Sequence, residues 1–202
     1  MTTNFTTEEL REALLDDRLA SYVRLRGGFP IPLAGATYWL ALGIAGYYLE
    51  LGNWAQLAFW GSGAIFPLAL LYAAFFRNNF LKDQTATGSV LVPAFVSMLL
   101  FWAFIVVAGS EAPSMISLIL AIGMSIHWPV IGWSYGRSAL FSMHAIARAI
   151  IPTALWIYYP DERLTWLPLS VSAIYLITIL AIVIDSNMVQ RKLSLKAQQS
   201  AV

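Results

Sequence analysis

The chain has 202 residues, of which 59% are apolar and 11% charged, and its mean hydropathy is +0.68. A soluble domain usually carries about 25% charged residues, so the composition excludes an ordinary soluble globular protein, and the high hydropathy excludes a disordered chain. The sequence contains no cysteine and two histidines, which excludes disulfides, iron–sulfur clusters and zinc sites built from cysteine or three histidines. The net charge of +1 gives no reason to expect a nucleic acid partner.

Polar segments flank the apolar part of the chain. Within residues 1–30, Thr6 and Glu9 predict a capping box for a short amphipathic helix, and Gly27-Gly28 predicts a hinge after it. This helix is interpreted as packing under its own bundle or, alternatively, as a surface for the membrane, a partner protein or a second copy. Residues 186–202 are predicted to form a basic cytoplasmic tail that frays or lies near lipid headgroups.

Six continuous apolar stretches of 21 to 23 residues lie between these segments. A bilayer core of about 30 Å needs about 20 helical residues, so each stretch can span it once. We place the spans at residues 31–51, 54–76, 88–109, 113–133, 139–159 and 164–185. Their apolar residues do not alternate with polar ones, which favours helices over a β-barrel. The predicted fold is an all-α integral membrane bundle of six transmembrane helices over residues 31–185.

The distribution of Lys and Arg predicts the orientation of this bundle. Ten of the twelve basic residues fall in segments that an even number of spans places on one side of the membrane. Arg163 falls on the other side, and Arg148 falls inside the fifth span. The excess of positive charge in cytoplasmic segments predicts that both termini are cytoplasmic. The expected location is the inner or plasma membrane.

The prolines inside the spans allow two interpretations. Pro67 and Pro152 each occupy the fourteenth position of their spans, the second and the fifth, and Pro93 and Pro168 occupy similar positions in the third and sixth. A 3+3 inverted repeat consists of three spans followed by three that enter the membrane from the opposite side. This layout is common in secondary transporters. Chance is the alternative, because proline is frequent in membrane helices.

Most of the chemically distinctive side chains fall in the fourth and fifth spans. The helical rise places His127 and His144 at similar depth on consecutive antiparallel helices. His144 and Arg148 are four residues apart and share one helix face. Pro129 breaks the fourth span and frees a backbone carbonyl, that of Ser125, near His127.

Arg148 requires a partner at its depth. An arginine near the middle of a membrane costs at least about 2.5 kcal/mol on insertion scales. The nearest acidic residues in depth are Glu50 and Asp185, about ten residues from the midplane. Backbone carbonyls, water or an anionic ligand remain as partners, and a guanidinium beside imidazoles suits a carboxylate or phosphate. Arg148 is therefore interpreted either as part of an anion site or as a structural lock between helices.

These residues predict a ligand site between the fourth and fifth spans. Its candidate members are Arg148, His144, His127, Trp128, Tyr135 and Arg137, with helix kinks at Pro129 and Pro152. Arg137 is interpreted either as a guide for anions or as an ordinary cytoplasmic charge. The leading function is a small transporter or ligand-binding membrane protein for an anionic small molecule.

Two further functions stay open. A haem-binding redox protein could use His127 and His144 as axial ligands, but packed consecutive helices lie only about 8–10 Å apart. A non-catalytic scaffold or accessory subunit could bind its partner through the N-terminal helix. The Gly61-Ser62-Gly63 pattern is interpreted as helix packing. An enzyme is not favoured, because the sequence presents no nucleophile–base set and no metal-binding motif.

Overall fold

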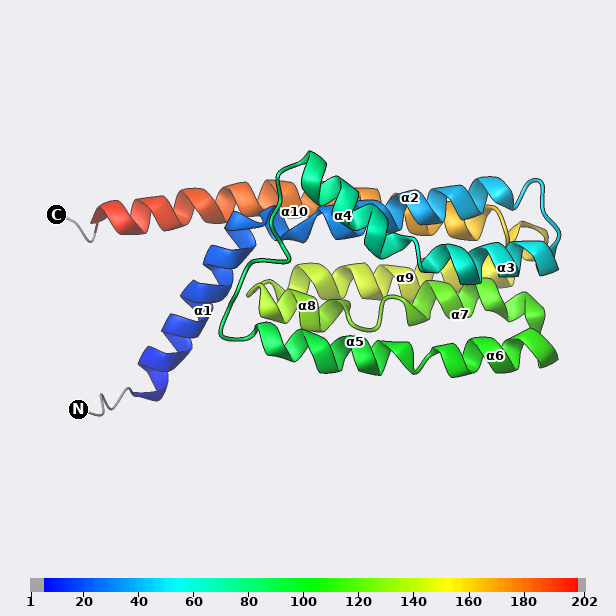
Figure 1. Ribbon diagram of the computed structural model, residues 1–202, viewed down its shortest axis with the longest axis horizontal. Helices are drawn as coiled ribbons and strands as arrows, with labels where there is room; N and C mark the ends of the chain where they lie inside the picture. The colour runs from blue at the N-terminus through cyan, green and yellow to red at the C-terminus, as the bar shows by residue number, and fades with distance from the viewer. Residues whose placement is uncertain (1–5, 200–202) are drawn as a thin grey trace.

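The computed structural model describes residues 6–199, and every regular element in that range is helical (Figure 1). The first element is α1 (Thr7–Arg24), which the short 3-10 helix η1 (Arg26–Gly28) joins to the bundle. The bundle contains α2 (Pro30–Ala45), α3 (Leu51–Ser62), α4 (Ile65–Phe75), η2 (Gly88–Val90), α5 (Leu91–Leu99), α6 (Trp102–Glu111), η3 (Pro113–Met115), α7 (Ile116–Gly123), α8 (Trp128–Ser134), α9 (Ser138–Tyr158), η4 (Pro160–Glu162) and α10 (Trp166–Gln199).

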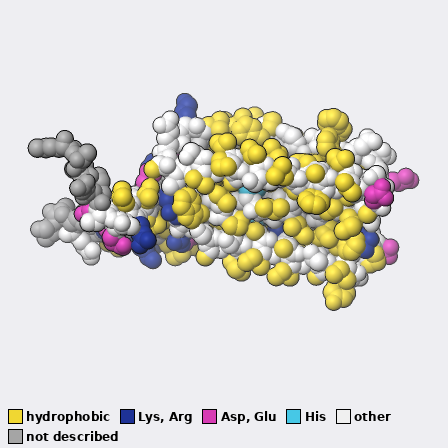
Figure 2. All heavy atoms as spheres, turned by 90° about the horizontal axis from the view of Figure 1, so that it is seen from below, with side chains coloured by type: hydrophobic (Ala, Val, Ile, Leu, Met, Phe, Trp, Pro, Cys, Tyr) yellow, Lys and Arg dark blue, Asp and Glu magenta, His cyan; other side chains and the backbone are white. Residues whose placement is uncertain are grey.

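Among the described residues, five helical segments are long and apolar enough to cross a membrane, and there are six if the bent pair α3 and α4 is one span. The protein is therefore a multi-pass membrane protein. Figure 2 shows hydrophobic side chains over most of its length, whereas Lys and Arg gather at the end that carries α1. We call this end, which carries η1, the 76–87 loop and the 135–137 turn, the basal end.

Three of the six spans are interrupted. The axes of α3 and α4 meet at 50° across residues 63–64, and shorter breaks separate α5 from α6 and α7 from α8. Pro129 stands in the first turn of α8, directly after the break that separates α7 from α8. Pro152, in contrast, lies inside the continuous helix α9.

The interruptions fall unevenly on the two halves of the bundle. Pro67 follows the break before α4, whereas Pro152, its counterpart in the proposed repeat, lies in an unbroken helix. The sixth span is likewise continuous in α10. The proline positions therefore do not produce the same local structure in the two halves.

The last helix is longer than the sequence analysis expects. The predicted basic tail begins at residue 186, but α10 continues without a break to Gln199. The expectation that this tail frays is wrong for residues 186–199, which contain no Gly or Pro and several good helix formers. The first span is shorter than expected, because α2 ends at Ala45 and residues 46–50 form a turn.

The N-terminal helix begins as the sequence predicts. The Thr6 hydroxyl accepts a hydrogen bond from the Glu9 backbone N–H at 3.2 Å, and the Glu9 carboxylate accepts one from the Thr6 N–H at 2.7 Å, so the capping box is confirmed. The hydrogen bond from the Thr6 backbone lowers the pKa of Glu9. Gly27 and Gly28 both adopt positive φ and form the expected hinge.

The second half of α1 is fixed to the basal end through the 76–87 loop. Asp83 of this loop accepts hydrogen bonds from the Ser21 hydroxyl at 2.5 Å and the Arg24 guanidinium at 2.9 Å. The Asn78 amide donates to the Leu25 carbonyl at 2.6 Å. Because these contacts join segments about 60 residues apart, α1 packs under its own bundle along this half.

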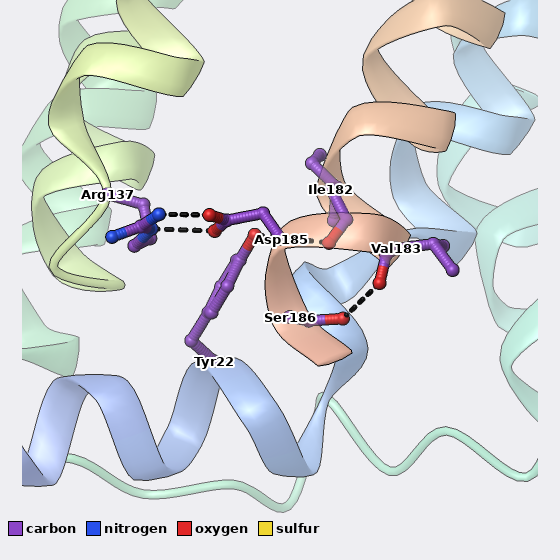
Figure 3. A network of polar contacts seen from close by, with 6 residues as sticks. All are labelled: Tyr22, Arg137, Ile182, Val183, Asp185 and Ser186. Carbon is purple, nitrogen blue, oxygen red and sulfur yellow. Dashed lines mark hydrogen bonds and ion pairs between the residues drawn. The ribbon is translucent and has the colours of Figure 1, made fainter. Parts of the chain in front are cut away.

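Tyr22 connects α1 to α10 and to the turn before α9 (Figure 3). Its hydroxyl donates to the Ile182 carbonyl at 3.2 Å. Beside it, Asp185 accepts hydrogen bonds from Arg137, one of them at 2.7 Å, and forms an ion pair with it. Burial, followed by the Asp185 carboxylate, raises the pKa of Tyr22, so the phenol remains a hydrogen-bond donor at neutral pH.

Candidate functional site

A cavity of about 440 Å³ extends from η1 at the basal end towards the middle of the bundle. Side chains from α2, α4, α5, α8 and α10 and from the 76–87 loop line it, and most of them are apolar. Phe66 on α4 and Phe95 on α5 line the cavity and are themselves exposed. Its size and mostly apolar lining fall within the range found for small-molecule sites.

The three interrupted spans meet at this cavity. The lining residues next to the breaks are Ser62, Ile65, Met98, Met124, His127 and Trp128. Interrupted helices are tolerated at membrane depth only where protein or a cavity surrounds the freed backbone groups. Such breaks are typical of substrate sites near the membrane midplane.

Tyr175 on α10 brings a polar group to the wall of the cavity. Arg148 donates a hydrogen bond from Nη1 to the Tyr175 hydroxyl at 2.8 Å, and its guanidinium lies 5.1 Å from the centre of the Tyr175 ring. Tyr175 lines the cavity, whereas Arg148 lies behind it and is fully buried. Because the phenol oxygen accepts from Arg148, its own hydrogen is free to point elsewhere.

The hydrogen-bonding capacity of the Arg148 guanidinium is only partly used. Its Nη1 also approaches the Met124 carbonyl at 3.4 Å, but its Nε and Nη2 have no partner within residues 6–199. The buried indole N–H of Trp39, whose ring lies 5.5 Å from the guanidinium, also has no partner in that range. The ion pairs found in the described chain do not include Arg148. Its buried charge is therefore unmatched by a carboxylate of that part of the chain.

His144 lies on the same face of α9 as Arg148, as the spacing predicts. The Thr178 hydroxyl gives its hydrogen to the Ile174 carbonyl at 2.7 Å, so it accepts at 2.8 Å from His144 Nδ1. In the neutral ring, Nε2 then carries the lone pair, and this atom is buried without a partner among the described residues. His144 also stacks on Trp128, with the ring centres 3.6 Å apart.

The two histidines face different surroundings. His127 lines the cavity next to Phe95, whereas Trp128, which also lines it, covers one face of His144. A haem with two axial histidines needs an open slot that both rings enter. Since only His127 lines the cavity, this geometry does not favour the haem alternative. Nor do any three His, Asp or Glu residues of the described chain group closely enough to hold a metal ion.

Tyr135 and Arg137 lie at the basal end, apart from the buried arginine. Tyr135 lines the cavity, and its hydroxyl lies close to Gly28, where an added Cβ would meet it at 2.7 Å. Arg137 pairs with Asp185 instead of lining the cavity. The structure thus brings Trp128, His144 and Arg148 together around Tyr175 and places Arg137 in a separate network.

Several residues that contact this site could not be foreseen from the sequence. The prediction that Pro129 leaves the Ser125 carbonyl free is wrong, because this carbonyl accepts the Trp128 backbone N–H at 3.1 Å. The carbonyl near Arg148 is instead that of Met124. Tyr175 and Thr178 are three residues apart on the sixth span, so they share a face, and this spacing is the one signal that could have indicated them. Nothing in the sequence around Trp39 distinguishes it from an ordinary apolar residue.

The chain matches the model of a family of unknown function, DUF7010, over residues 15–185. The chain belongs to the DUF7010 family. The match covers every element that lines the cavity and leaves out the first turns of α1 and the distal part of α10. Neither the curated proteins nor the solved structures gave a match to this DUF7010 protein.

Proposed function

We propose that this DUF7010 protein is a ligand-binding membrane protein whose cavity takes an amphiphile with an apolar body and a carboxylate head. The observation that carries the proposal is an apolar cavity with Tyr175 in its wall and the unmatched charge of Arg148 behind it. An apolar body would bury its surface against α2, α4 and α5. The head would lie near Tyr175 and His127, where the described lining offers hydrogen-bonding groups.

The preference for an anion follows from the charge and donors around Arg148. A buried cation is costly unless an opposite charge or several acceptors compensate it. A carboxylate in the cavity next to Tyr175 would accept the free phenol hydrogen and would lie within the field of the guanidinium. An alcohol of the same chain length fills the same volume without the charge. The ratio of the two affinities therefore reports the contribution of Arg148.

The first test compares dodecanoate with dodecanol on the purified full chain by calorimetry. Replacing Tyr175 with Phe removes one hydrogen bond to a charged group, worth about 1.5 kcal/mol, so we expect dodecanoate affinity to fall roughly tenfold and dodecanol affinity to fall less. The matched control is Tyr158→Phe, because Tyr158 is exposed and lies at the C-terminal end of α9. Equal dodecanoate affinity in the Tyr175→Phe variant and the parent would contradict the proposed position of the head.

We also propose that the basal end faces the cytoplasm. Helix α1 and the end of α10 lie at this end (Figure 1), and the spans place ten basic residues there, against Arg163 at the other end. Reporters fused after Gln199 and within the exposed turn at Tyr48 should respond as cytoplasmic and external, respectively. The reverse pattern would refute this orientation.

A further inference from the structure

A second hollow of about 460 Å³ lies at the basal end, next to the cavity of the proposed function, and Phe80 and Leu81 line both. It is formed by the end of α4 and the first half of the 76–87 loop. Its polar lining consists of Arg77, Asn78, Asn79 and Lys82, and its apolar lining includes Leu70 and Ala73. Two cations therefore lie next to an apolar helix surface.

The acidic residue nearest in sequence does not neutralise these cations. Asp83 follows Lys82 directly but does not line the hollow, because its carboxylate is bound by Ser21 and Arg24 of α1. No other Asp or Glu of the described chain lines the hollow. Its lining carries a charge of +2 and lacks an acidic counterpart.

The backbone at the end of α4 is also satisfied internally. Arg77 adopts a φ of 53°, and the N–H of Asn78 binds the Ala73 carbonyl at 2.8 Å. The N–H groups of Phe76 and Arg77 bind the carbonyls of Tyr72 and Ala74. This arrangement closes the helix and uses the carbonyls that would otherwise repel an anion.

Asn78 brings a further polar side chain to the lining of the hollow. It lines the hollow and is 8% exposed, and its amide nitrogen binds the Leu25 carbonyl. That bond fixes the direction of the amide, so its Oδ1 remains an acceptor, and this atom is buried with no partner in residues 6–199. A ligand that suits the hollow combines an anionic group for Arg77 and Lys82 with a hydroxyl or ammonium donor for Asn78.

We propose that this hollow binds the headgroup of an anionic phospholipid, such as phosphatidylglycerol. Its phosphate would lie between Arg77 and Lys82, its glycerol hydroxyls near Asn78, and the start of its acyl chains against Leu70. The adjoining surface of α4 suits those chains, because Leu71 and Phe75 are exposed and apolar. The chemistry recognised is a phosphate diester, and the apolar half of the lining favours a lipid over a soluble phosphate.

Native mass spectrometry of the full chain with phosphatidylglycerol and phosphatidylcholine tests this site. The double variant Arg77→Gln/Lys82→Gln should lower the preference for phosphatidylglycerol roughly tenfold, since basic residues near an anionic surface each contribute to binding. Arg191→Gln/Lys192→Gln on α10 removes the same charge elsewhere and should lower the preference much less. Equal losses in the two double variants would overturn the proposal. General electrostatic attraction between basic side chains and anionic lipid would then explain the preference for phosphatidylglycerol.

A further variant and a competition experiment complete the test of this site. Asn79→Asp adds a negative charge to the hollow at an exposed position without altering either cation, and it should lower the preference even if the double variant folds poorly. Inorganic phosphate at millimolar concentration should not displace the lipid. Full displacement by phosphate would overturn the lipid as the ligand, and an unchanged preference in Asn79→Asp would overturn the site. Neither result depends on whether the cavity binds dodecanoate.

Discussion

Replacing Arg148 with methionine is expected to remove the preference for dodecanoate over dodecanol while the alcohol still binds. Two unit charges about 8 Å apart at an effective dielectric constant of about 20 interact by about 2 kcal/mol, which corresponds to about a 30-fold change in affinity. Methionine fills much of the volume of the arginine stem and adds no polar group. Calorimetry with both ligands measures the ratio directly.

The controls for this variant separate charge from packing. Arg148→Lys keeps the positive charge but loses the guanidinium group that reaches Tyr175. This variant should therefore retain part of the preference for dodecanoate over dodecanol. Arg163→Met removes an arginine that lies over Trp156 at the opposite end and should leave both affinities unchanged. A carboxylate preference that survives in Arg148→Met would contradict the proposed function. A folded variant that loses both ligands equally would instead support a structural lock between the helices.

Replacing Gly46 with alanine is expected to lower the free energy of unfolding strongly. A Cβ at Gly46 would lie 2.0 Å from the Leu164 carbonyl oxygen and 2.5 Å from its carbon, and a backbone obstacle cannot move aside as a side chain can. Overpacking of this kind costs about 3 kcal/mol. The midpoint of thermal unfolding, followed by tryptophan fluorescence in detergent, should fall by about 10 °C.

The matched control for Gly46 lies six residues later. Gly52 is in the first turn of α3 and has no atom within 4 Å of an added Cβ. Alanine there should leave stability unchanged or raise it by up to about 0.8 kcal/mol, because alanine is the better helix former. Equal melting temperatures for Gly46→Ala and Gly52→Ala would show that Gly46 does not lie against the Leu164 carbonyl as described.

The arrangement of the spans could be predicted from the sequence because the bilayer imposes a length on each apolar run. The interruptions were harder to foresee. Pro129 indicates the break before α8, but the pattern Gly61-Ser62-Gly63, interpreted as packing, marks the end of α3. The break at Leu100 and Phe101 has neither Gly nor Pro beside it, so tertiary contacts must set it.

The site was predictable only where a residue type is rare in membranes. Arg148 and His144 stand out because ionisable residues are uncommon at this depth, and the structure places them together around Trp128 and Tyr175. Tyr175 and Trp39 do not stand out among the apolar and aromatic residues of the spans. Asp83 escaped notice because its partners on α1 are about 60 residues away in sequence.

The attachment of α1 has a consequence for the order in which the protein is assembled. Synthesis begins at the N-terminus, so α1 leaves the ribosome before any of its partners. Asp83, which holds Ser21, is made about 60 residues later, and Ile182, which accepts from Tyr22, is made 160 residues later. The contacts of α1 with Asp83 can therefore form once the first two spans have been made, whereas its contact with α10 must wait for the sixth span.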